Sequence, residues 1–247
     1  MPAFKDHFSR QSAAYSRHRP GYPPELIDFV AASTPDHDLA IDCATGNGQA
    51  ALQLATHFEL VLAIDGSQSQ IAQARQHERV RYTAATAESL PVLSARAALV
   101  AAAQAVHWFD FARFYAECRR VLRPRGVVAV WTYELFRADG APDAIVDDFY
   151  AHEVGDYWPP ERRYVEHGYR TLPFPFVEER CPAFELVTEW SLDDVLGYLG
   201  SWSAVQRYKD AKGQDPLPAL RERLDAAWGP DATRRLRWPI HLRLGRV

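Results

Sequence analysis

The chain has 247 residues, enough for one large domain or for a domain with a cap. Hydrophobic residues make up 47% of it, a share typical of a globular protein with a packed core. The 28 basic and 32 acidic residues give a net charge of −4, which offers no basic surface for nucleic acid.

The N-terminal segment is expected to be helical and to be interrupted by prolines. Residues 3–18 are compatible with a short polar helix, and Pro20 and Pro23 cannot continue a helix interior. Pro24 can open the next helix, because a proline is tolerated in the first helical turn. The opening residues also lack the apolar segment of a signal peptide, and the chain has no run of 18 apolar residues to span a membrane.

The middle of the chain alternates between apolar runs and segments with helical spacing. Strands that alternate with helices predict a parallel sheet with right-handed crossovers. The fourth strand is ambiguous with helix, because it is rich in alanine. The predicted strands are residues 39–44, 60–65, 79–85, 97–106 and 127–133, and the predicted helices are residues 48–57, 67–76 and 110–122.

The pattern changes after Tyr133. Residues 134–182 are rich in aromatics and prolines and indicate an insertion of helix and loop without a core of its own. A sixth strand is predicted at about 183–190, Ser191 can cap a helix, and a further helix spans 218–228. Residues 236–247 alternate as a closing strand, in which Pro239 predicts an edge position or a bulge.

These elements predict an α/β fold: a Rossmann-like, doubly wound, mostly parallel seven-stranded sheet with helices on both faces and an inserted helical cap.

Three cysteines, Cys43, Cys118 and Cys181, are widely spaced and form no CxxC pair. They indicate reduced thiols and a cytoplasmic location rather than a disulfide framework, and they predict no metal site.

The segment DCATGNGQ, which follows the first predicted strand, is the main functional signal. Gly46 and Gly48 allow a tight turn with accessible backbone N–H groups. Asp65 ends the second strand 19 residues after Gly46, the spacing of a nucleotide-binding βαβ unit, and a carboxylate there can accept hydrogen bonds from ribose hydroxyls. The stretch GNGQAA also fits a dinucleotide fingerprint, and a purely structural turn is a further alternative.

Asp42 separates these alternatives. It lies four residues before Gly46, where a dinucleotide would place its pyrophosphate and where further negative charge is unfavourable. S-adenosylmethionine carries an ammonium and a sulfonium and no phosphate, so a carboxylate at this position suits it. The residues therefore favour this cofactor over a nicotinamide dinucleotide.

The sequence resembles the class I S-adenosylmethionine-dependent methyltransferases over residues 40–132. DCATGNGQ is similar to their glycine motif, AIDGS to their second motif, ATAESLP to their adenine loop and AAAQAVHWFD to their fourth-strand motif. VLRPRGVVAVW is similar to their turn and fifth strand. The flanking HFSRQSAAYSRHRPGYPPEL, GYLGSWSAVQRY and GQDPLPALRERLDAAWG resemble the trans-aconitate methyltransferase-like small-molecule branch.

The resemblance implies a division of the chain and a set of cofactor residues. Residues 1–36 would form an N-terminal helical lid, 37–133 the cofactor-binding core, 134–235 a cap that includes one core strand, and 236–247 the closing strand. The implied contacts to S-adenosylmethionine, or to its product S-adenosylhomocysteine, come from Tyr15, Arg19, Asp42, Ala44, Gly46, Gly48, Asp65, Gly66, Thr86, Ala87, Glu88 and Gln104.

Two of these positions depart from the family pattern. Ala44 replaces the usual first glycine, so we expect a slightly different turn. Thr86 replaces an aspartate that contacts the adenine amino group, and a hydroxyl replaces that acceptor only in part. Glu88 either contacts the cofactor or caps a turn.

His107 is the candidate catalytic residue, because neutral imidazole can accept a proton near pH 7. The alternative is that it hydrogen-bonds and shapes the pocket wall. Candidate substrate residues are Trp108, Tyr133, Trp202 and Arg207, for which packing or a solvated charge is an equal alternative.

The predicted activity is methyl transfer from S-adenosylmethionine to a small-molecule acceptor, with a carboxylic acid as one candidate. The alternatives are an NAD-dependent oxidoreductase and a non-catalytic cofactor-binding protein. The sequence leaves open the accepting atom, the need for a base and the oligomeric state, and it predicts no nucleic-acid or membrane partner.

Overall fold

The computed structural model of the chain describes residues 21–229 and 232–247. The predicted helix at 3–18, and with it Tyr15 and Arg19, lies outside the described residues. In the described part of the chain, eight strands build a single sheet: β1 (Leu39–Cys43), β2 (Leu60–Asp65), β3 (Val80–Ala84), β4 (Ala97–Ala103), β5 (Leu122–Tyr133), β6 (Val177–Glu179), β7 (Phe184–Trp190) and β8 (Arg234–Arg246).

The strand order confirms the predicted doubly wound fold. The order is β3-β2-β1-β4-β5-β8-β6, and β7 also pairs with β8. β1 to β5 pair in parallel, whereas β8 is antiparallel to β5, β6 and β7. The predicted sixth strand is present as β7, but the short β6 precedes it on the same edge of β8, which gives eight strands instead of seven.

The order of the strands reverses between β1 and β4. In a parallel sheet this switch point leaves a crevice beyond the carboxyl ends of the two strands, where ligands bind. The turns after β1, β2 and β4 therefore all lie at the same end of the sheet, which we call the carboxyl end.

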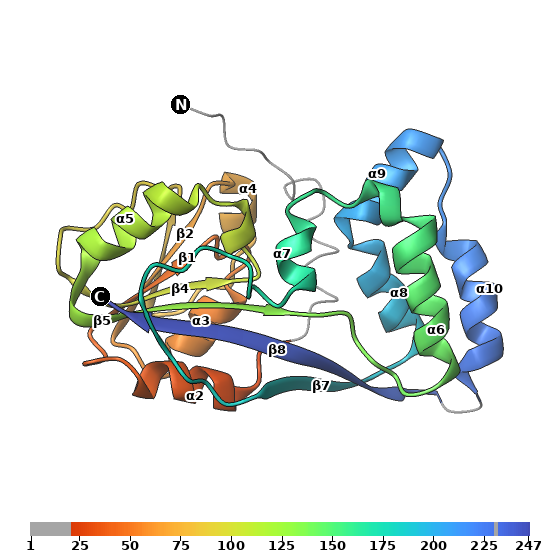
Figure 1. Cartoon of the computed structure of the whole chain (residues 1–247), viewed down its shortest axis with the longest axis horizontal. Helices are drawn as coiled ribbons and strands as arrows, with labels where there is room; N and C mark the ends of the chain where they lie inside the picture. The colour runs from red at the N-terminus through yellow and green to blue at the C-terminus, as the bar shows by residue number, and fades with distance from the viewer. Residues whose placement is uncertain (1–20, 230–231) are drawn as a thin grey trace.

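Helices cover both faces of the sheet (Figure 1). Around it lie α2 (Pro24–Ala32), α3 (Gln49–Leu54), α4 (Gln68–Ile71), η2 (Val106–Trp108) and α5 (Phe111–Val121). The remaining helical elements are α6 (Ala141–Asp148), η3 (Phe149–Glu153), η4 (Gly155–Tyr157), α7 (Arg162–Glu166), α8 (Leu192–Gly200), α9 (Ser203–Lys212) and α10 (Leu217–Trp228).

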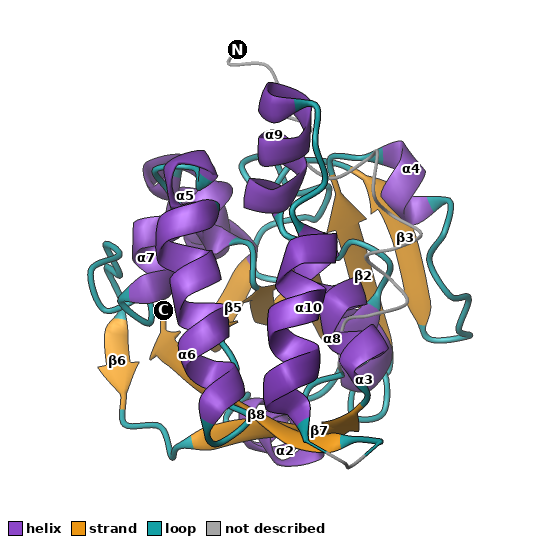
Figure 2. Cartoon of the chain, turned by 90° about the vertical axis from the view of Figure 1, so that its right-hand side faces the viewer, coloured by secondary structure: helices purple, strands orange, loops and turns teal. Residues whose placement is uncertain are grey.

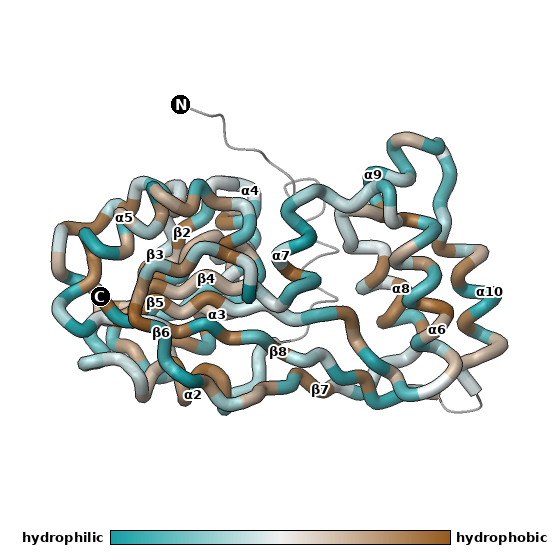
Figure 3. Tube along the Cα trace, viewed as in Figure 1, coloured by the Kyte–Doolittle hydropathy of each residue, from teal (hydrophilic) through white to brown (hydrophobic). Residues whose placement is uncertain are grey.

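The buried strands divide their side chains between the two faces. Ala40 and Leu99 belong to the cluster that contains α2 and α3, while their neighbours Ile41 and Val100 belong to the cluster under α5. This is the period-two alternation of a strand that is buried on both sides. Figure 3 shows the resulting apolar centre of the sheet.

The helices α6, α8, α9 and α10 lie together at one end of the molecule (Figure 1), and Figure 2 views them in front of the sheet. We call this group the cap. The β7–β8 ribbon runs from the sheet to this cap, and α7 lies between the two parts (Figure 1). Phe149, Trp202 and Trp228 of the cap are buried in the same cluster as α2 and α3. The cap therefore shares its core with the sheet.

Local signals account for most helix ends. Pro24 opens α2 as predicted, and the Ser191 side chain accepts from the Asp194 N–H in a capping box that starts α8. The Ser67 side chain caps α4 as predicted, but α4 ends at Ile71 rather than near residue 76. α5 ends at Val121, one residue before the end of the predicted helix, and the chain continues directly into β5 at Leu122, five residues before the start of the predicted strand.

Pro239 lies where β8 changes its neighbours. The β5–β8 pairing ends at Tyr133 and Ile240, and beyond this point the main partner of β8 is β7. Pro239 pairs with Glu185 of β7 and accepts a hydrogen bond from the Glu134 N–H at its carbonyl. A residue without an N–H is tolerated here because the β5 ladder has already ended.

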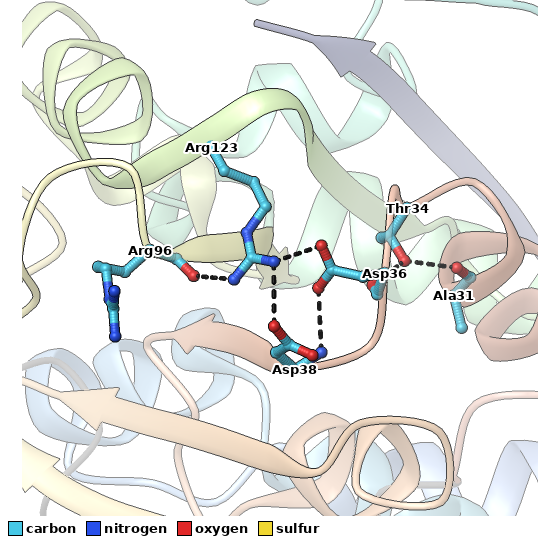
Figure 4. A network of polar contacts seen from close by, with 6 residues as sticks. All are labelled: Ala31, Thr34, Asp36, Asp38, Arg96 and Arg123. Carbon is cyan, nitrogen blue, oxygen red and sulfur yellow. Dashed lines mark hydrogen bonds and ion pairs between the residues drawn. The ribbon is translucent and has the colours of Figure 1, made fainter.

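A network of polar contacts ties the opposite, amino end of the sheet together (Figure 4). The Arg123 guanidinium, at the start of β5, donates to the carboxylates of Asp36 and Asp38 and to the Arg96 carbonyl oxygen (2.6 Å). Asp36 in turn accepts from the Asp38 N–H (3.1 Å). We call these residues the Arg123 network; they join the chain before β1 and β4 to β5.

Candidate functional site

The turn after β1 has an unusual backbone conformation. Ala44, Gly46 and Gly48 all have positive φ angles, of 55°, 59° and 89°. Glycine adopts this region at no steric cost, whereas an alanine is strained there by roughly 1–2 kcal/mol. Ala44 thus takes a glycine-like conformation in spite of its side chain, and the turn keeps the form that a glycine would give.

Asp42 ends β1 beneath this turn and is almost fully buried, with 1% of its surface exposed. Its Oδ2 atom accepts from the Thr45 hydroxyl at 2.5 Å. Its Oδ1 atom has no hydrogen-bond partner among the residues that the structure describes. Burial, opposed in part by the Thr45 hydrogen bond, raises the pKa of Asp42 to about 7.

Asp65, at the end of β2, holds the same turn from the other side. Its Oδ2 atom accepts from the Gly46 N–H (2.9 Å), and its Oδ1 atom accepts from the Ser67 N–H (2.8 Å). Asp65 therefore fixes the backbone on both sides of the crevice, at Gly46 and at Ser67. The two acids that the sequence singled out therefore lie on one turn.

The cofactor fits two features of this turn. The lone Oδ1 atom of Asp42 provides a buried acceptor for a positively charged group. On the other side, a Cβ atom built on Gly46 would meet no described atom within 4 Å, so the backbone there borders open space. These features match a cofactor that has an ammonium group and a ribose but no phosphate.

The predicted adenine loop lies next to the second strand. Thr86 is exposed and Ala87 is buried. The Glu88 carboxylate accepts from the Asp110 N–H at 3.0 Å, next to α5. Gly66 lies half-buried directly after Asp65.

Gln104 follows β4 and has a positive φ angle of 57°. Its Oε1 atom accepts from the hydroxyl of the fully buried Thr132 in β5 (2.7 Å), and its own N–H donates to the Trp131 carbonyl (2.8 Å). Among the described residues, its Nε2 atom has no hydrogen-bond partner. Gln104 is thus held rigidly at the carboxyl end of β4.

His107 lies in η2 and is buried, with 8% of its surface exposed. Its Nδ1 atom lies 2.7 Å from the hydroxyl oxygen of Tyr169, which is fully buried. Burial, together with the charge of Arg162, lowers the pKa of His107 to about 3. The ring is therefore neutral at pH 7, and it holds a proton only weakly.

The hydrogen bond between His107 and Tyr169 links the tautomer of the ring to its direction. Nδ1 either donates to the Tyr169 oxygen, which leaves Nε2 as a hydrogen-bond acceptor, or accepts from the Tyr169 hydroxyl, which leaves Nε2–H as a donor. Tyr169 also contacts Thr132 of β5, whose hydroxyl donates to Gln104.

The candidate substrate residues lie in two places. The Trp108 ring packs beside His107, with the centroids 4.8 Å apart, and the buried Tyr133 ends β5. Trp202 is buried in the cap, where its ring contacts those of Phe149, Tyr150, Trp158 and Tyr198. Arg207 is half-buried in α9, and its side chain forms no hydrogen bond or ion pair within residues 21–229 and 232–247.

Sequence reasoning missed Tyr169, Thr132 and Arg162. Tyr169 lies 62 residues after His107, in the insertion whose pattern gave no functional signal. Thr132 reads as an ordinary strand residue. The link between them arises because the chain returns from the insertion under the carboxyl end of β4, which no local pattern encodes.

The comparisons with known proteins agree with this geometry. Residues 41–130 match the family model described as a methyltransferase domain. A Dictyostelium discoideum protein, provisionally named a methyltransferase, is 34% identical over 229 residues, which are 91% of this chain and 87% of that protein. A Saccharomyces cerevisiae protein, provisionally named an S-adenosylmethionine-dependent methyltransferase, is 26% identical over 50% of this chain and 45% of its own length.

A solved structure resembles nearly the whole molecule. It is described, again provisionally, as a type II methyltransferase from Anaeromyxobacter dehalogenans; it is 48% identical, has a TM-score of 0.86, and the match covers 92% of this chain and 97% of the other. The chain belongs to the class I S-adenosylmethionine-dependent methyltransferases.

The described residues contain neither a candidate membrane span nor a cluster of metal ligands, and they include a concavity away from the turn after β1. None of their helices is long and apolar enough to cross a lipid bilayer, and they hold no group of three acidic, histidine or cysteine side chains able to bind a metal. A concavity of about 540 Å³ lies where β8 faces the gap between β6 and β7, and Arg170, Cys181 and His241 are among its lining residues. It does not include the residues of the turn after β1.

Proposed function

We propose that this methyltransferase transfers a methyl group to a small molecule that is already ionised at neutral pH, such as a carboxylic acid. S-adenosylmethionine supplies an electrophilic methyl group on a sulfonium, which leaves as a neutral thioether. Because this leaving group needs no acid, the protein contributes mainly position and exclusion of water.

The cofactor would be held by the residues of the turn after β1. Asp42 would accept from the ammonium of the methionine portion, and Asp65 would accept from the ribose hydroxyls. Gly46 and Gly48 would contribute close backbone approach, Gly66, Thr86, Ala87 and Glu88 would border the adenine, and Gln104 would lie near the transferred methyl. Tyr15 and Arg19, outside the described residues, would close a lid over the cofactor.

The neutral, weakly basic His107 is the observation that carries the choice of acceptor. A base with a pKa of about 3 does not remove a proton from an alcohol or an amine at pH 7. Burial also raises the pKa of Tyr169, so its phenol stays protonated. A carboxylate needs neither group, because it is ionised at pH 7.

In this reaction a carboxylate oxygen forms a bond to the methyl carbon while the carbon–sulfur bond breaks and its electron pair stays on sulfur. A methyl ester and S-adenosylhomocysteine result, and no proton moves. His107 would then orient the acceptor molecule by donating a hydrogen bond from Nε2–H to its carboxylate, with Nδ1 accepting from the Tyr169 hydroxyl. Trp108, Tyr133, Trp202 and Arg207 would line the pocket.

The proposal includes the division into a lid (1–36), a cofactor core (37–133), a cap (134–235) and a closing strand (236–247). Membership of the trans-aconitate methyltransferase-like branch and a cytoplasmic location also remain predictions.

Calorimetric titration with S-adenosylhomocysteine and with NADH tests the identity of the cofactor. We expect binding of S-adenosylhomocysteine only, and binding of NADH alone would favour the oxidoreductase alternative.

Incubation with radiolabelled S-adenosylmethionine and a cell metabolite extract tests the acceptor. We expect the label in a methyl ester. Mild alkali should release it as labelled methanol, because methyl esters hydrolyse under these conditions. Label in an alkali-stable product would contradict an ester, and no transfer to any acceptor would favour the non-catalytic alternative.

A further inference from the structure

Arg162 opens α7, the short helix between the sheet and the cap (Figure 1). Its guanidinium lies over the Trp158 ring, 4.5 Å from the centroid, and over the Tyr150 ring at 5.3 Å. Its Nε–H group donates to the Tyr150 hydroxyl at 2.8 Å. Stacking and one hydrogen bond thus fix the plane of the guanidinium and leave its two terminal nitrogens facing elsewhere.

No carboxylate lies within ion-pair distance of Arg162 among the described residues. The other half-buried arginines differ from it, apart from Arg207. Arg120, Arg123, Arg223, Arg237, Arg243 and Arg246 are paired with carboxylates, and Arg234 donates to main-chain carbonyls. Arg162 is therefore a partly desolvated cation whose four terminal N–H donors have no protein acceptor there.

The place of Arg162 in the fold connects it with the reaction. α7 packs against η2, which carries His107 at the carboxyl end of β4. The charge of Arg162 acts on both His107 and the buried Tyr169. The guanidinium therefore borders the side of the crevice that the cap covers, where the acceptor must lie if Asp42 and Asp65 hold the cofactor.

We infer that Arg162 binds a carboxylate of the methyl acceptor through its two terminal nitrogens. This inference rests on the proposed function and names the residue that selects an acidic acceptor. A planar guanidinium matches a carboxylate in two parallel hydrogen bonds, and stacking on Trp158 and Tyr150 orders it before the ligand arrives. The rings of Tyr150 and Trp158 beside it, which pack against Trp202, favour an acceptor with a flat, apolar body.

Benzoate and benzamide are suitable probes, because they share a flat ring and differ mainly in charge. Their binding is measured by ligand-observed NMR titration of the full chain, with and without saturating S-adenosylhomocysteine. We expect the wild type to bind benzoate about tenfold more tightly than benzamide, as a charge-assisted contact contributes roughly that factor. In Arg162→Gln the two affinities become equal.

Two variants serve as controls. Arg163→Gln removes the neighbouring, exposed arginine of α7, which contacts only Tyr164, and should keep the wild-type preference. Arg162→Lys keeps the positive charge but loses the planar fork, so it should keep a weaker preference for benzoate. This charge-retaining variant also separates loss of the ionic contact from a general disturbance of α7.

The remaining outcomes overturn the inference. Equal binding of the two probes by the wild type, absent benzoate binding, or a preference that survives in Arg162→Gln would each do so. A loss of affinity for S-adenosylhomocysteine in Arg162→Gln, with the benzoate preference intact, would assign the arginine to the cofactor carboxylate instead. If the wild type fails to bind S-adenosylhomocysteine while Arg162 still selects benzoate, the proposed function fails and the anion site stands.

Discussion

Arg123 and Arg162 lie at opposite ends of the sheet and differ in what surrounds them. Arg123 joins two carboxylates and a carbonyl at the amino end, so that charge and hydrogen bonds are balanced within the fold (Figure 4). At the carboxyl end, Arg162 has no carboxylate partner within the described residues, and Asp42 has a buried oxygen without a donor. Because uncompensated buried polar groups cost stability, their concentration at one end indicates a binding site.

The largest expected effect concerns Asp42. Asp42→Asn should weaken binding of S-adenosylhomocysteine by about 10- to 100-fold at pH 7.5, because a charged hydrogen bond to the ammonium is replaced by a neutral one. Calorimetry measures this directly. Asp38→Asn, which removes a carboxylate of the Arg123 network, is the matched control and should leave the affinity unchanged; equal losses in both variants would contradict the contrast between the two ends.

The same carboxylate should give the free protein an unusual pH dependence. A folded-state pKa of about 7, against an ordinary value of 3.8, means that the folded state binds the extra proton between these values. This contribution to stability is present at low pH and is lost as pH rises from 3.8 to 7, by a total of about 4 kcal/mol. Urea denaturation of the wild type and of Asp42→Asn from pH 4.5 to 7.5 should show this fall as the difference between the two curves, and parallel curves would disprove it.

At the amino end, Arg123→Gln should lower the free energy of unfolding by about 1–2 kcal/mol, since it leaves Asp36 and Asp38 without their common cation. Affinity for S-adenosylhomocysteine should stay within twofold of the wild type, because the network lies far from the turn after β1. Urea denaturation and calorimetry provide the two values. A marked loss of cofactor affinity at full stability would reverse the interpretation of this network.

Tyr169 tests the hydrogen-bond chain of the carboxyl end. Tyr169→Phe should cost about 1–2 kcal/mol of unfolding free energy, because His107 Nδ1 and Thr132 lose a buried partner. Tyr164→Phe, in the same segment, loses only an exposed contact and should cost less than 0.5 kcal/mol on the scale of surface changes. Similar costs for the two variants would indicate that the chain through Tyr169 contributes nothing.

The smallest expected effect is at Ala44. Ala44→Gly relieves the strain of a positive φ angle but increases the freedom of the unfolded chain, so a net stabilisation of about 0.5 kcal/mol is expected. Gly46→Ala is its counterpart and should destabilise by about 1 kcal/mol, because it creates the same strain in an open position. Thermal unfolding of both variants checks the opposite signs.

Local sequence signals predicted much of the fold. Pro24, Ser67 and Ser191 start helices where expected, and the strand at Leu60–Asp65 has the predicted bounds. The additional strand β6 was not predicted, because a short exposed strand such as Val177–Glu179 lacks an apolar pattern and forms only against β8.

The sequence by itself predicted the turn after β1 and the two acids beside it. The conformation of this turn depends on its own glycines and on carboxylates at the ends of two adjacent strands, all of which can be recognised from local sequence. The sequence could not identify Arg162 or Tyr169. An arginine or a tyrosine in an aromatic-rich insertion has the same local pattern whether it packs in the core, forms an ion pair or binds a ligand. Their roles depend on which side chains the fold brings beside them. That is decided when α7 packs between the cap and η2, where the half-buried Arg162 has no carboxylate partner among the described residues.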